Sequence, residues 1–438
     1  MKKDFRLFFI MFGIATFLNV GYALLRSLRT TLAVVDLGDG AGSIPLFELC
    51  GSMPGAVLMT MGLTWLLNRF NIYKAFLITL SCFVGFFVAF VTCIYPFLVP
   101  GTWIAKGASM LFFTMAELWK IGLFTVLFWG LINQHLPLEK AKKFYAPLMV
   151  GASIGTLLSG PLIELCKIEN SWIQSLHWMI GSLTLLSAIT LWLFYHLWKS
   201  FAGPKREEVP SENPRLSVLE SLRVCLRSPQ LMLLGWITIA TYVAYALGEV
   251  LFLDILKQKF PSPVDYCSYH GKLSLWSGLL TALSALIITP LLLRRCRWVV
   301  TSLITPICLL VTEVAFFGSL WIPSLHIDVA IIFGTLMFCL LRAAKFTLFD
   351  TSKELSFLLL PPLEKMQGKL IIDGICSRAG RGGASLLSIF LIQAAGGVLA
   401  SSPIAGVLAI LISGSCVFST ARLGALLEKR SAQQSNAP

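Results

Sequence analysis

The feature that most constrains this chain is a series of apolar stretches, each long enough to cross a lipid bilayer. A helix needs about 20 mostly apolar residues for this purpose. About twelve such stretches follow one another, at 7–25, 42–67, 75–98, 107–133, 146–166, 177–197, 230–253, 273–293, 298–320, 329–349, 369–391 and 399–422. A hydrophobic content of 56% against 13% charged residues argues against a soluble protein of this size. The sequence therefore predicts an all-α polytopic membrane protein with about twelve transmembrane helices.

The charge balance restricts the partners of the chain. A net charge of +13 fits nucleic acid, an anionic membrane surface or an anionic substrate, so the placement of the cations has to decide. With the first residues inside the cell, 23 Lys and Arg fall in inner segments and 7 in outer segments. The positive-inside rule then predicts that both termini are cytoplasmic. We expect a lipid bilayer, and not nucleic acid, around these flanking cations.

Motifs of metal and enzyme chemistry are missing from the sequence. The eleven Cys are scattered without a CxxC pair, and the sequence contains no HxxxH and no GxxxxGK[ST]. No nucleophile–base arrangement stands out either. We therefore expect no metal, no cofactor and no enzymatic activity.

A polar segment near the middle divides the chain into two similar halves. The predicted parts are a six-helix bundle at 1–198, a cytoplasmic linker with an interfacial helix at 199–229, and a second bundle at 230–438. The tetrapeptide PLEK occurs in each half, 225 residues apart, at Pro137 and at Pro362. At the same offset, four further matches occur: Lys120 with Lys345, Leu123-Phe124 with Leu348-Phe349, Arg69 with Arg294, and Gly155 with Gly380. Duplicated six-helix units predict a major-facilitator-like carrier with two pseudo-symmetric bundles and a substrate site between them.

Four charged residues lie inside the fourth and tenth predicted spans, where each costs about 2.5–3.5 kcal/mol on insertion scales. Glu117 and Lys120 are three residues apart and share one helix face, so they either neutralise each other or contact a substrate. Arg342 and Lys345 occupy equivalent places, with no carboxylate in that span before Asp350. A bound polyphosphate would offset this excess of positive charge, because Arg and Lys both bind phosphate oxygens.

Other charges within or near the spans allow two interpretations each. Glu249 either pairs with Lys257 or accepts a proton during transport, since a buried carboxylate can titrate. Arg26 and Arg29 are either interfacial side chains or a cation pair at the mouth of a cavity. Glu313 lies in a span that we expect to be peripheral, and we assign it a structural role.

Several stretches resemble the ATP/ADP translocases of plastids and obligate intracellular bacteria, and the likeness covers nearly the whole chain. NVGYALLRSLRTTL resembles the first span of that family and its cationic motif, and MAELWKIGLFTVLFWGLIN resembles its fourth span. The most specific stretch is TSKELSFLLLPPLEKMQGKLIIDGICSRAGRGGASLL, with a KE pair, a GK pair and a basic glycine-rich turn. The glycines of this turn either admit phosphate to the backbone amides or allow close helix packing.

The resemblance implies a carrier of ATP and ADP, located in the inner membrane of a bacterium. Carried over by position, the functional charges of the family fall on Arg29, Glu117, Glu249 and Lys369, with Lys353 as a further candidate. Together with the residues argued above, the predicted substrate-binding set is Arg26, Arg29, Glu117, Lys120, Glu249, Arg342, Lys345, Lys353, Lys369, Arg378 and Arg381.

The sequence departs from the family pattern near the first two spans. Arg29-Thr30 replaces the usual Lys-Asp, Gly42 replaces a Glu, and Glu48 replaces a Lys. Two functions therefore stay open at this point. One is the exchange of ATP for ADP, and the other is proton-coupled import of nucleotides or of another phosphorylated anion such as a dinucleotide.

Overall fold

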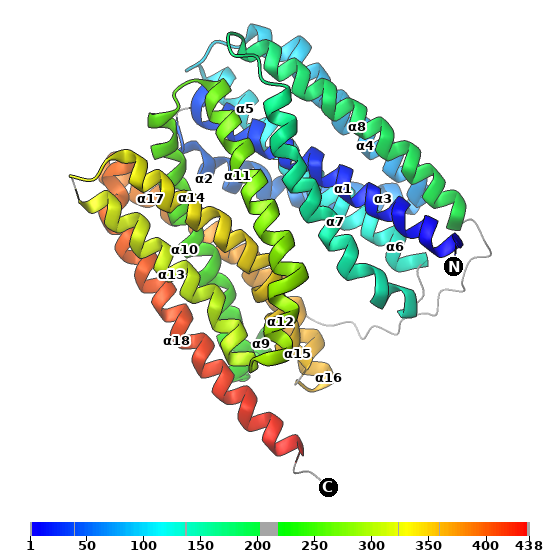
Figure 1. Cartoon of the computed structure of the whole chain (residues 1–438), viewed down its shortest axis with the longest axis vertical. Coiled ribbons are helices and arrows are strands. Elements are labelled where there is room, and N and C mark those ends of the chain that lie inside the picture. The colour runs from blue at the N-terminus through cyan, green and yellow to red at the C-terminus, as the bar shows by residue number, and fades with distance from the viewer. Residues whose placement is uncertain are drawn as a thin grey trace. The chain divides into compact units, whose positions relative to one another are not determined.

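The structure is a computed structural model that describes residues 2–38, 40–135, 138–201, 218–322, 324–358 and 360–435. These residues form helices joined by short turns and contain no β-strand (Figure 1). The predicted all-α fold is confirmed. Residues 202–217, which hold most of the predicted linker, lie outside the described part of the chain.

Among the described residues, eleven helices are long and apolar enough to cross a membrane. They agree with eleven of the predicted spans. The predicted span at 369–391 is not one of them, although helix α17 (Ser377–Ala395) occupies most of it. The first two turns of α17 carry Arg378, Arg381 and three glycines, which make this end of the helix polar.

The chain divides into two compact units by its internal contacts. The first unit comprises Met1–Glu207 together with Leu256–Ala282. Its helices are α1 (Lys2–Thr31), α2 (Ser43–Phe47), α3 (Met53–Arg69), α4 (Ile72–Ala89), α5 (Trp103–Trp119), α6 (Trp129–His135), α7 (Leu138–Leu165), α8 (Trp172–Phe201) and nearly all of α11 (Pro263–Leu283).

The second unit comprises Glu208–Ile255 and Leu283–Pro438. Its helices are α9 (Val218–Arg227), most of α10 (Pro229–Lys259), α12 (Thr289–Arg295), α13 (Trp298–Trp321), α14 (Ile327–Ala344), α15 (Asp350–Leu358), α16 (Pro362–Lys369), α17 and α18 (Ser402–Ser435). The division into bundles at 199–229 stays a prediction.

Several of the long helices contain short π-helical segments. Two of these begin at equivalent lysines: Lys120 begins η5 (Lys120–Phe128), and Lys345 begins η7 (Lys345–Phe349). A π-helical turn widens the helix and is frequent at functional sites. The match between Lys120 and Lys345 in the sequence therefore extends to the local backbone.

The Trp119 side chain holds α5 against α1 and α4 in the first unit. The Trp119 side chain is 2% exposed, and its indole N–H donates a hydrogen bond to the Leu18 carbonyl over 3.2 Å. The Trp119 ring also packs against the edge of Phe83. Because Trp119 lies between Glu117 and Lys120 in the sequence, this anchor fixes the height of both charged residues along α1.

Glycines allow close helix crossings at equivalent places in the two units. A Cβ atom on Gly155 of α7 would lie 2.4 Å from the Thr16 carbonyl oxygen of α1. A Cβ atom on Gly380 of α17 would lie 3.2 Å from the Ile239 Cα of α10. These contacts are with backbone atoms, which cannot move aside as a side chain can.

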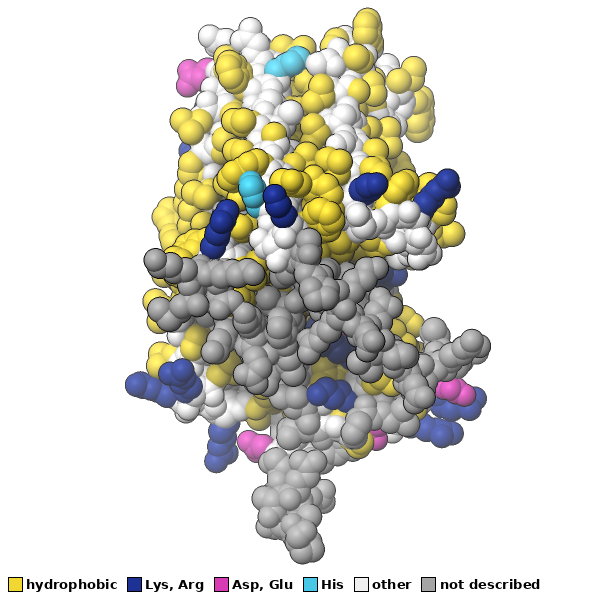
Figure 2. All heavy atoms as spheres, turned by 90° about the vertical axis from the view of Figure 1, so that its right-hand side faces the viewer, with side chains coloured by type: hydrophobic (Ala, Val, Ile, Leu, Met, Phe, Trp, Pro, Cys, Tyr) yellow, Lys and Arg dark blue, Asp and Glu magenta, His cyan; other side chains and the backbone are white. Residues whose placement is uncertain are grey.

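The outer surface of the helices suits a lipid environment. Large apolar side chains such as Trp192 and Phe390 are 61% and 66% exposed. Figure 2 shows one face, on which hydrophobic side chains cover most of the upper part and most of the visible Lys and Arg lie lower. Such a surface is stable in contact with acyl chains and unstable in contact with water.

Replacing Gly155 with valine should destabilise the first unit. The added Cβ would press on the Thr16 carbonyl, and overpacking of this kind costs about 1–3 kcal/mol. Gly181→Val is the matched control, because nothing lies within 4 Å of a Cβ at Gly181. Thermal unfolding of the purified variants in detergent measures the difference. Equal unfolding temperatures for the two variants would contradict the close crossing.

Candidate functional site

A buried ion pair joins α1 to α5 in the first unit. Arg29 Nη1 lies 2.7 Å from Glu117 Oε2, and the Arg29 residue is 7% exposed. The Tyr22 hydroxyl donates a hydrogen bond to the same Glu117 oxygen over 3.3 Å. The carboxylate therefore neutralises a guanidinium that would otherwise be very costly to bury.

The Arg29 guanidinium retains unused hydrogen-bonding capacity. Its Cζ lies 4.1 Å from the centroid of the Phe113 ring, within the range of a cation–π contact. Its Nε and Nη1 atoms are buried and have no aligned hydrogen-bond acceptor within the described residues. The contact with Glu117 is thus mainly Coulombic, and the remaining N–H groups are available to another acceptor.

Lys120 completes this cluster. Its Nζ lies 5.1 Å from the centroid of the Tyr22 ring, and Arg26 is partly buried one turn before Arg29. We call Tyr22, Arg26, Arg29, Glu117 and Lys120 the Arg29 cluster. It contains three cations and one carboxylate, so its charge is positive by two.

The second unit contains a cluster of similar construction. Lys345 Nζ lies 5.2 Å from the centroid of the Tyr242 ring, and Arg381 Cζ lies 5.5 Å from the same centroid. Arg342, one turn before Lys345 on α14, lies 5.4 Å from the Phe338 ring. We call Tyr242, Arg342, Lys345 and Arg381 the Tyr242 cluster. In both units, then, the first residue of a π-helical segment is a lysine held over a tyrosine.

Carboxylates accompany the remaining lysines of the predicted set. Lys353 Nζ donates a hydrogen bond to Asp373 Oδ1 over 2.6 Å and lies 3.8 Å from Asp350. Asp350 also lies 3.8 Å from Lys345. The ammonium group of Lys353 is thus engaged in ion pairs with Asp373 and Asp350.

Lys369 forms a second pair of this kind, with Glu354. The Lys369 Nζ atom lies 2.8 Å from Glu354 Oε2, and both side chains are about half exposed. A pair in this setting adds about 0–1 kcal/mol to stability. Arg378 is exposed on α17, apart from the aromatic contacts described above.

Two carboxylates in the second unit bind hydroxyl groups. Glu249 Oε1 accepts a hydrogen bond from the Tyr245 hydroxyl over 3.2 Å, and both residues belong to α10. Glu313 is fully buried, and its Oε2 accepts a hydrogen bond from Ser413 Oγ over 2.5 Å. The Glu313 contact joins α13 to α18, which supports the structural role that we expected for it.

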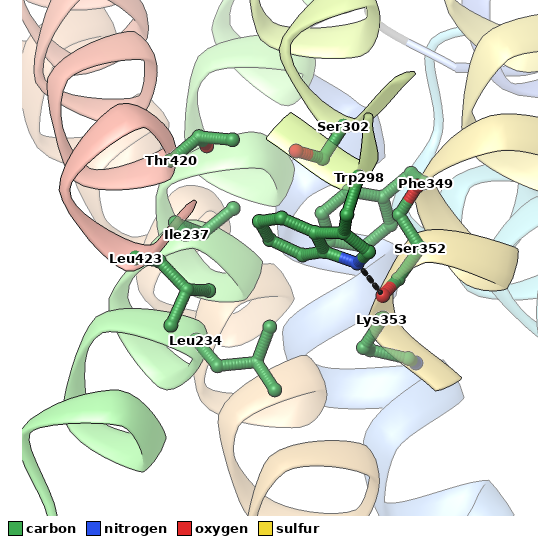
Figure 3. Close-up of a pocket in the computed structure, with 9 residues that line it drawn as sticks. All are labelled: Leu234, Ile237, Trp298, Ser302, Phe349, Ser352, Lys353, Thr420 and Leu423. Atoms are coloured by element: carbon green, nitrogen blue, oxygen red, sulfur yellow. Dashed lines mark hydrogen bonds between the residues drawn. The ribbon is translucent and has the colours of Figure 1, made fainter. Parts of the chain in front are cut away.

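A pocket in the second unit does not suit a polyphosphate. It lies among α10, α13, α15 and α18, and the Trp298 indole N–H donates to the Ser352 carbonyl over 3.0 Å at its wall (Figure 3). Its lining is mostly apolar and consists of Leu234, Ile237, Trp298, Ser302, Phe349, Ser352, Lys353, Thr420 and Leu423. The single cation, Lys353, already binds Asp373.

Sequence reasoning alone does not find the aromatic residues that contact the cations of both clusters. Tyr22, Tyr242 and Phe113 lie in apolar spans and have no spacing that separates them from ordinary lipid-facing or core residues. The one available signal concerns the two tyrosines, because the chain has only nine Tyr and most of its aromatic residues are Phe.

Comparison with known proteins identifies the family. The model of the TLC ATP/ADP transporter family matches residues 1–100 and 101–426. The chain belongs to this family. The resemblance found in the sequence is confirmed, and the chain is a transporter and not an enzyme.

Relatives within the TLC family occur in bacteria and in plastids. The ADP,ATP carrier protein 1 of Chlamydia trachomatis serovar D is 29% identical, with 92% of this chain and 84% of that protein covered. The chloroplastic ADP,ATP carrier protein 1 of Arabidopsis thaliana is 27% identical, with 89% of this chain and 69% of that protein covered. This chain is accordingly a multi-pass membrane protein of the same family.

Solved structures of other transporters share the fold. A mutant of the nucleoside transporter NupG has a TM-score of 0.66 at 13% identity, with 95% of this chain and 99% of that chain covered. A D-xylose-proton symporter has a TM-score of 0.62 at 13% identity, with 94% and 97% covered. The predicted major-facilitator-like fold is confirmed.

Removing the Glu117 carboxylate should strongly destabilise this TLC family protein. Glu117→Ala leaves the buried Arg29 guanidinium without its counter-charge, which costs about 3–5 kcal/mol. The double variant Arg29→Ala/Glu117→Ala should lose less than the sum of the single variants, because the pair is coupled. Thermal unfolding of all three proteins provides the test, and additive losses would contradict the ion pair.

Substitutions of Tyr242 should distinguish the contribution of its ring to substrate binding from that of its hydroxyl. Tyr242→Phe keeps an aromatic face under Lys345 and Arg381, whereas Tyr242→Leu removes it. We expect Tyr242→Leu to raise the KM for the transported substrate about 2- to 5-fold, since a cation–π contact contributes about 0.5–1 kcal/mol. Tyr242→Phe should remain close to the wild type. Equal KM values for the two variants would show that the ring does not position the cations.

Proposed function

We propose that this protein exchanges ATP for ADP across the membrane by alternating access. The observation that supports the proposal most is the repeated cluster of cations, with a lysine over a tyrosine ring in each compact unit, in a member of the TLC ATP/ADP transporter family. The curated relatives bear the name ADP,ATP carrier. Nucleotides are the class of substrate whose charge fits such clusters.

The cations of the two clusters supply the chemistry that phosphate requires. Arg342 and Arg381 offer planar forks that can bind two oxygens of one phosphate group, and Lys345 adds a point charge. In the first unit, Arg26, Arg29 and Lys120 play the same parts. A phosphate chain with several negative charges offsets the cost of holding these cations in a membrane, about 2.5–3.5 kcal/mol each.

The carboxylates have a different role in this scheme. Glu117 neutralises Arg29 in the absence of substrate, and a phosphate can take over part of that interaction because Arg29 retains unused N–H groups. We assign Glu249, whose carboxylate accepts a hydrogen bond from Tyr245, the same role for cations of the second unit. Exchange of acidic partners lowers the cost of releasing the nucleotide again.

Lys353 and Lys369 contribute indirectly. Both are paired with carboxylates, and these pairs join α15 to η8 (Leu370–Cys376) and α15 to α16. We assign them the positioning of this part of the second unit. Their substitution should then impair transport by altering the structure around Asp350 and Asp373.

The proposed setting is the inner membrane of a bacterium, with both termini in the cytoplasm. The driving force in this scheme is the counter-substrate, because no ATPase motif occurs in the sequence. A proton gradient is the alternative driving force, and the transport experiment separates the two.

Uptake of labelled ATP into proteoliposomes tests the proposal. Vesicles loaded with ADP should take up ATP, and empty vesicles should not, even when the exterior is acidic. Uptake into empty vesicles driven by an acid exterior would overturn obligatory exchange and favour proton coupling. A second measurement compares Arg342→Gln with Arg297→Gln, whose arginine is 83% exposed beside Glu428.

Arg342→Gln should raise the KM for ATP by about 10- to 150-fold, the factor that corresponds to a charge-assisted hydrogen bond of about 1.5–3 kcal/mol. Arg297→Gln should leave the KM unchanged. If both variants behave like the wild type, Arg342 does not contact the substrate.

A further inference from the structure

Helix α11 approaches α7 so closely that two glycines are required. A Cβ atom on Gly160 would lie 2.5 Å from the Gly271 carbonyl oxygen, and a Cβ atom on Gly278 would lie 2.5 Å from the Leu157 nitrogen. Close backbone contacts through small residues are a usual way for membrane helices to pack. They leave α11 no freedom to rotate or slide without losing the contact.

Polar contacts fix the same helix at its Pro263 end. Ser268 Oγ donates a hydrogen bond to Glu164 Oε2 over 2.6 Å, and Lys167 Nζ lies 3.3 Å from Asp265 Oδ1. The position of α11 in the first unit is therefore determined by both its backbone and its side chains.

This placement brings two buried residues of α11 against α1. The Cys267 thiol is fully buried in the core of the first unit and interacts with the Thr31 hydroxyl. His270 lies one turn further along α11 and is 5% exposed. It interacts electrostatically with the positive charges of Arg26 and Arg29. His270 therefore lies within electrostatic range of two cations of the Arg29 cluster.

Hydrogen-bonding groups remain unused on His270 and on Arg29. His270 Nε2 is buried and has no partner within the described residues, and the same holds for Arg29 Nε. An unsatisfied buried polar atom costs about 1–3 kcal/mol, so both atoms favour a ligand that accepts hydrogen bonds. The surrounding charge is positive, which selects an anion.

We propose that His270 binds a phosphate group of the transported nucleotide, together with Arg26 and Arg29. The neutral imidazole donates its Nε2–H to a phosphate oxygen, and the guanidinium groups supply charge-assisted hydrogen bonds. This assignment rests on the proposed function. It adds a phosphate-binding residue that lies far from α1 in the sequence. It also makes α11 part of the binding site and not only of the scaffold.

A pair of amide substitutions tests the position of the hydrogen-bond donor. His270→Gln carries its amide about as far from the backbone as Nε2, whereas the shorter amide of His270→Asn cannot reach that point. Both variants place a neutral polar group in the same buried position. Ser274→Ala, a buried position one turn further along α11, is the control for small changes in this helix.

The measurement is the stabilisation of the purified protein against thermal unfolding by pyrophosphate, a probe with phosphate but no base. Because a ligand that binds only the folded state raises its stability, the midpoint of the titration reports affinity. We expect the wild type, His270→Gln and Ser274→Ala to share one midpoint. The midpoint of His270→Asn should lie at a pyrophosphate concentration at least about 10-fold higher, because this factor corresponds to the loss of one charge-assisted hydrogen bond.

The outcomes separate this inference from the proposed function. Equal midpoints for His270→Gln and His270→Asn would overturn it. If both variants lost the same affinity for pyrophosphate, the length of the side chain would not matter, and His270 would contribute packing alone. An absence of stabilisation of the wild type by pyrophosphate would also overturn it. ATP uptake into ADP-loaded vesicles is measured separately on the wild type, so failure of exchange leaves the pyrophosphate result unaffected.

Discussion

A cation buried in a membrane protein needs a negative or polarisable partner, and this requirement organises both units. Arg29 meets it with Glu117 and with the face of Phe113, and Lys120 meets it with the ring of Tyr22. Each partner belongs to a different turn or a different helix. The charges therefore act as contacts between helices, in a part of the chain where apolar packing alone has little specificity.

The two units satisfy this requirement with the same local device. Lys120 and Lys345 each begin a π-helical segment and each lie about 5 Å from a tyrosine ring. A wider turn leaves backbone carbonyls less tightly bonded and changes the direction of the side chain, which accommodates a long cationic side chain inside a helix bundle. Glycines recur near the device, because Gly155 brings α7 close to α1 and Gly380 brings α17 close to α10, the two helices that carry the tyrosines.

The fold could be predicted from the sequence because each span is encoded locally. An apolar stretch of sufficient length has one stable structure in lipid, a helix, and that inference needs no knowledge of the neighbours. The partners of the charges are not encoded in this way. Arg29 and Glu117 are far apart in the sequence, and the spacing of Glu117 and Lys120 suggested a pair within one helix.

His270 illustrates the same limit. A single histidine in an apolar span has no sequence neighbours that reveal a ligand site, so the sequence alone does not identify it as a binding residue. Its significance depends on two glycine contacts between α7 and α11, which set its height opposite Arg26 and Arg29. Small residues carry little signal in a single sequence, yet here they decide which polar atoms meet.

In the second unit, cations held by close carboxylate partners differ from cations that lie on aromatic rings. Lys353 binds Asp373 over 2.6 Å and Lys369 binds Glu354 over 2.8 Å, so a phosphate would have to compete with a carboxylate already in place. Arg342 and Arg381 instead rest on aromatic rings, which attract a cation without satisfying its N–H groups. An incoming anion can bind those N–H groups without displacing the ring. A carrier must bind its substrate and release it within one cycle, and in the second unit the cations on aromatic rings meet this need without displacing a carboxylate.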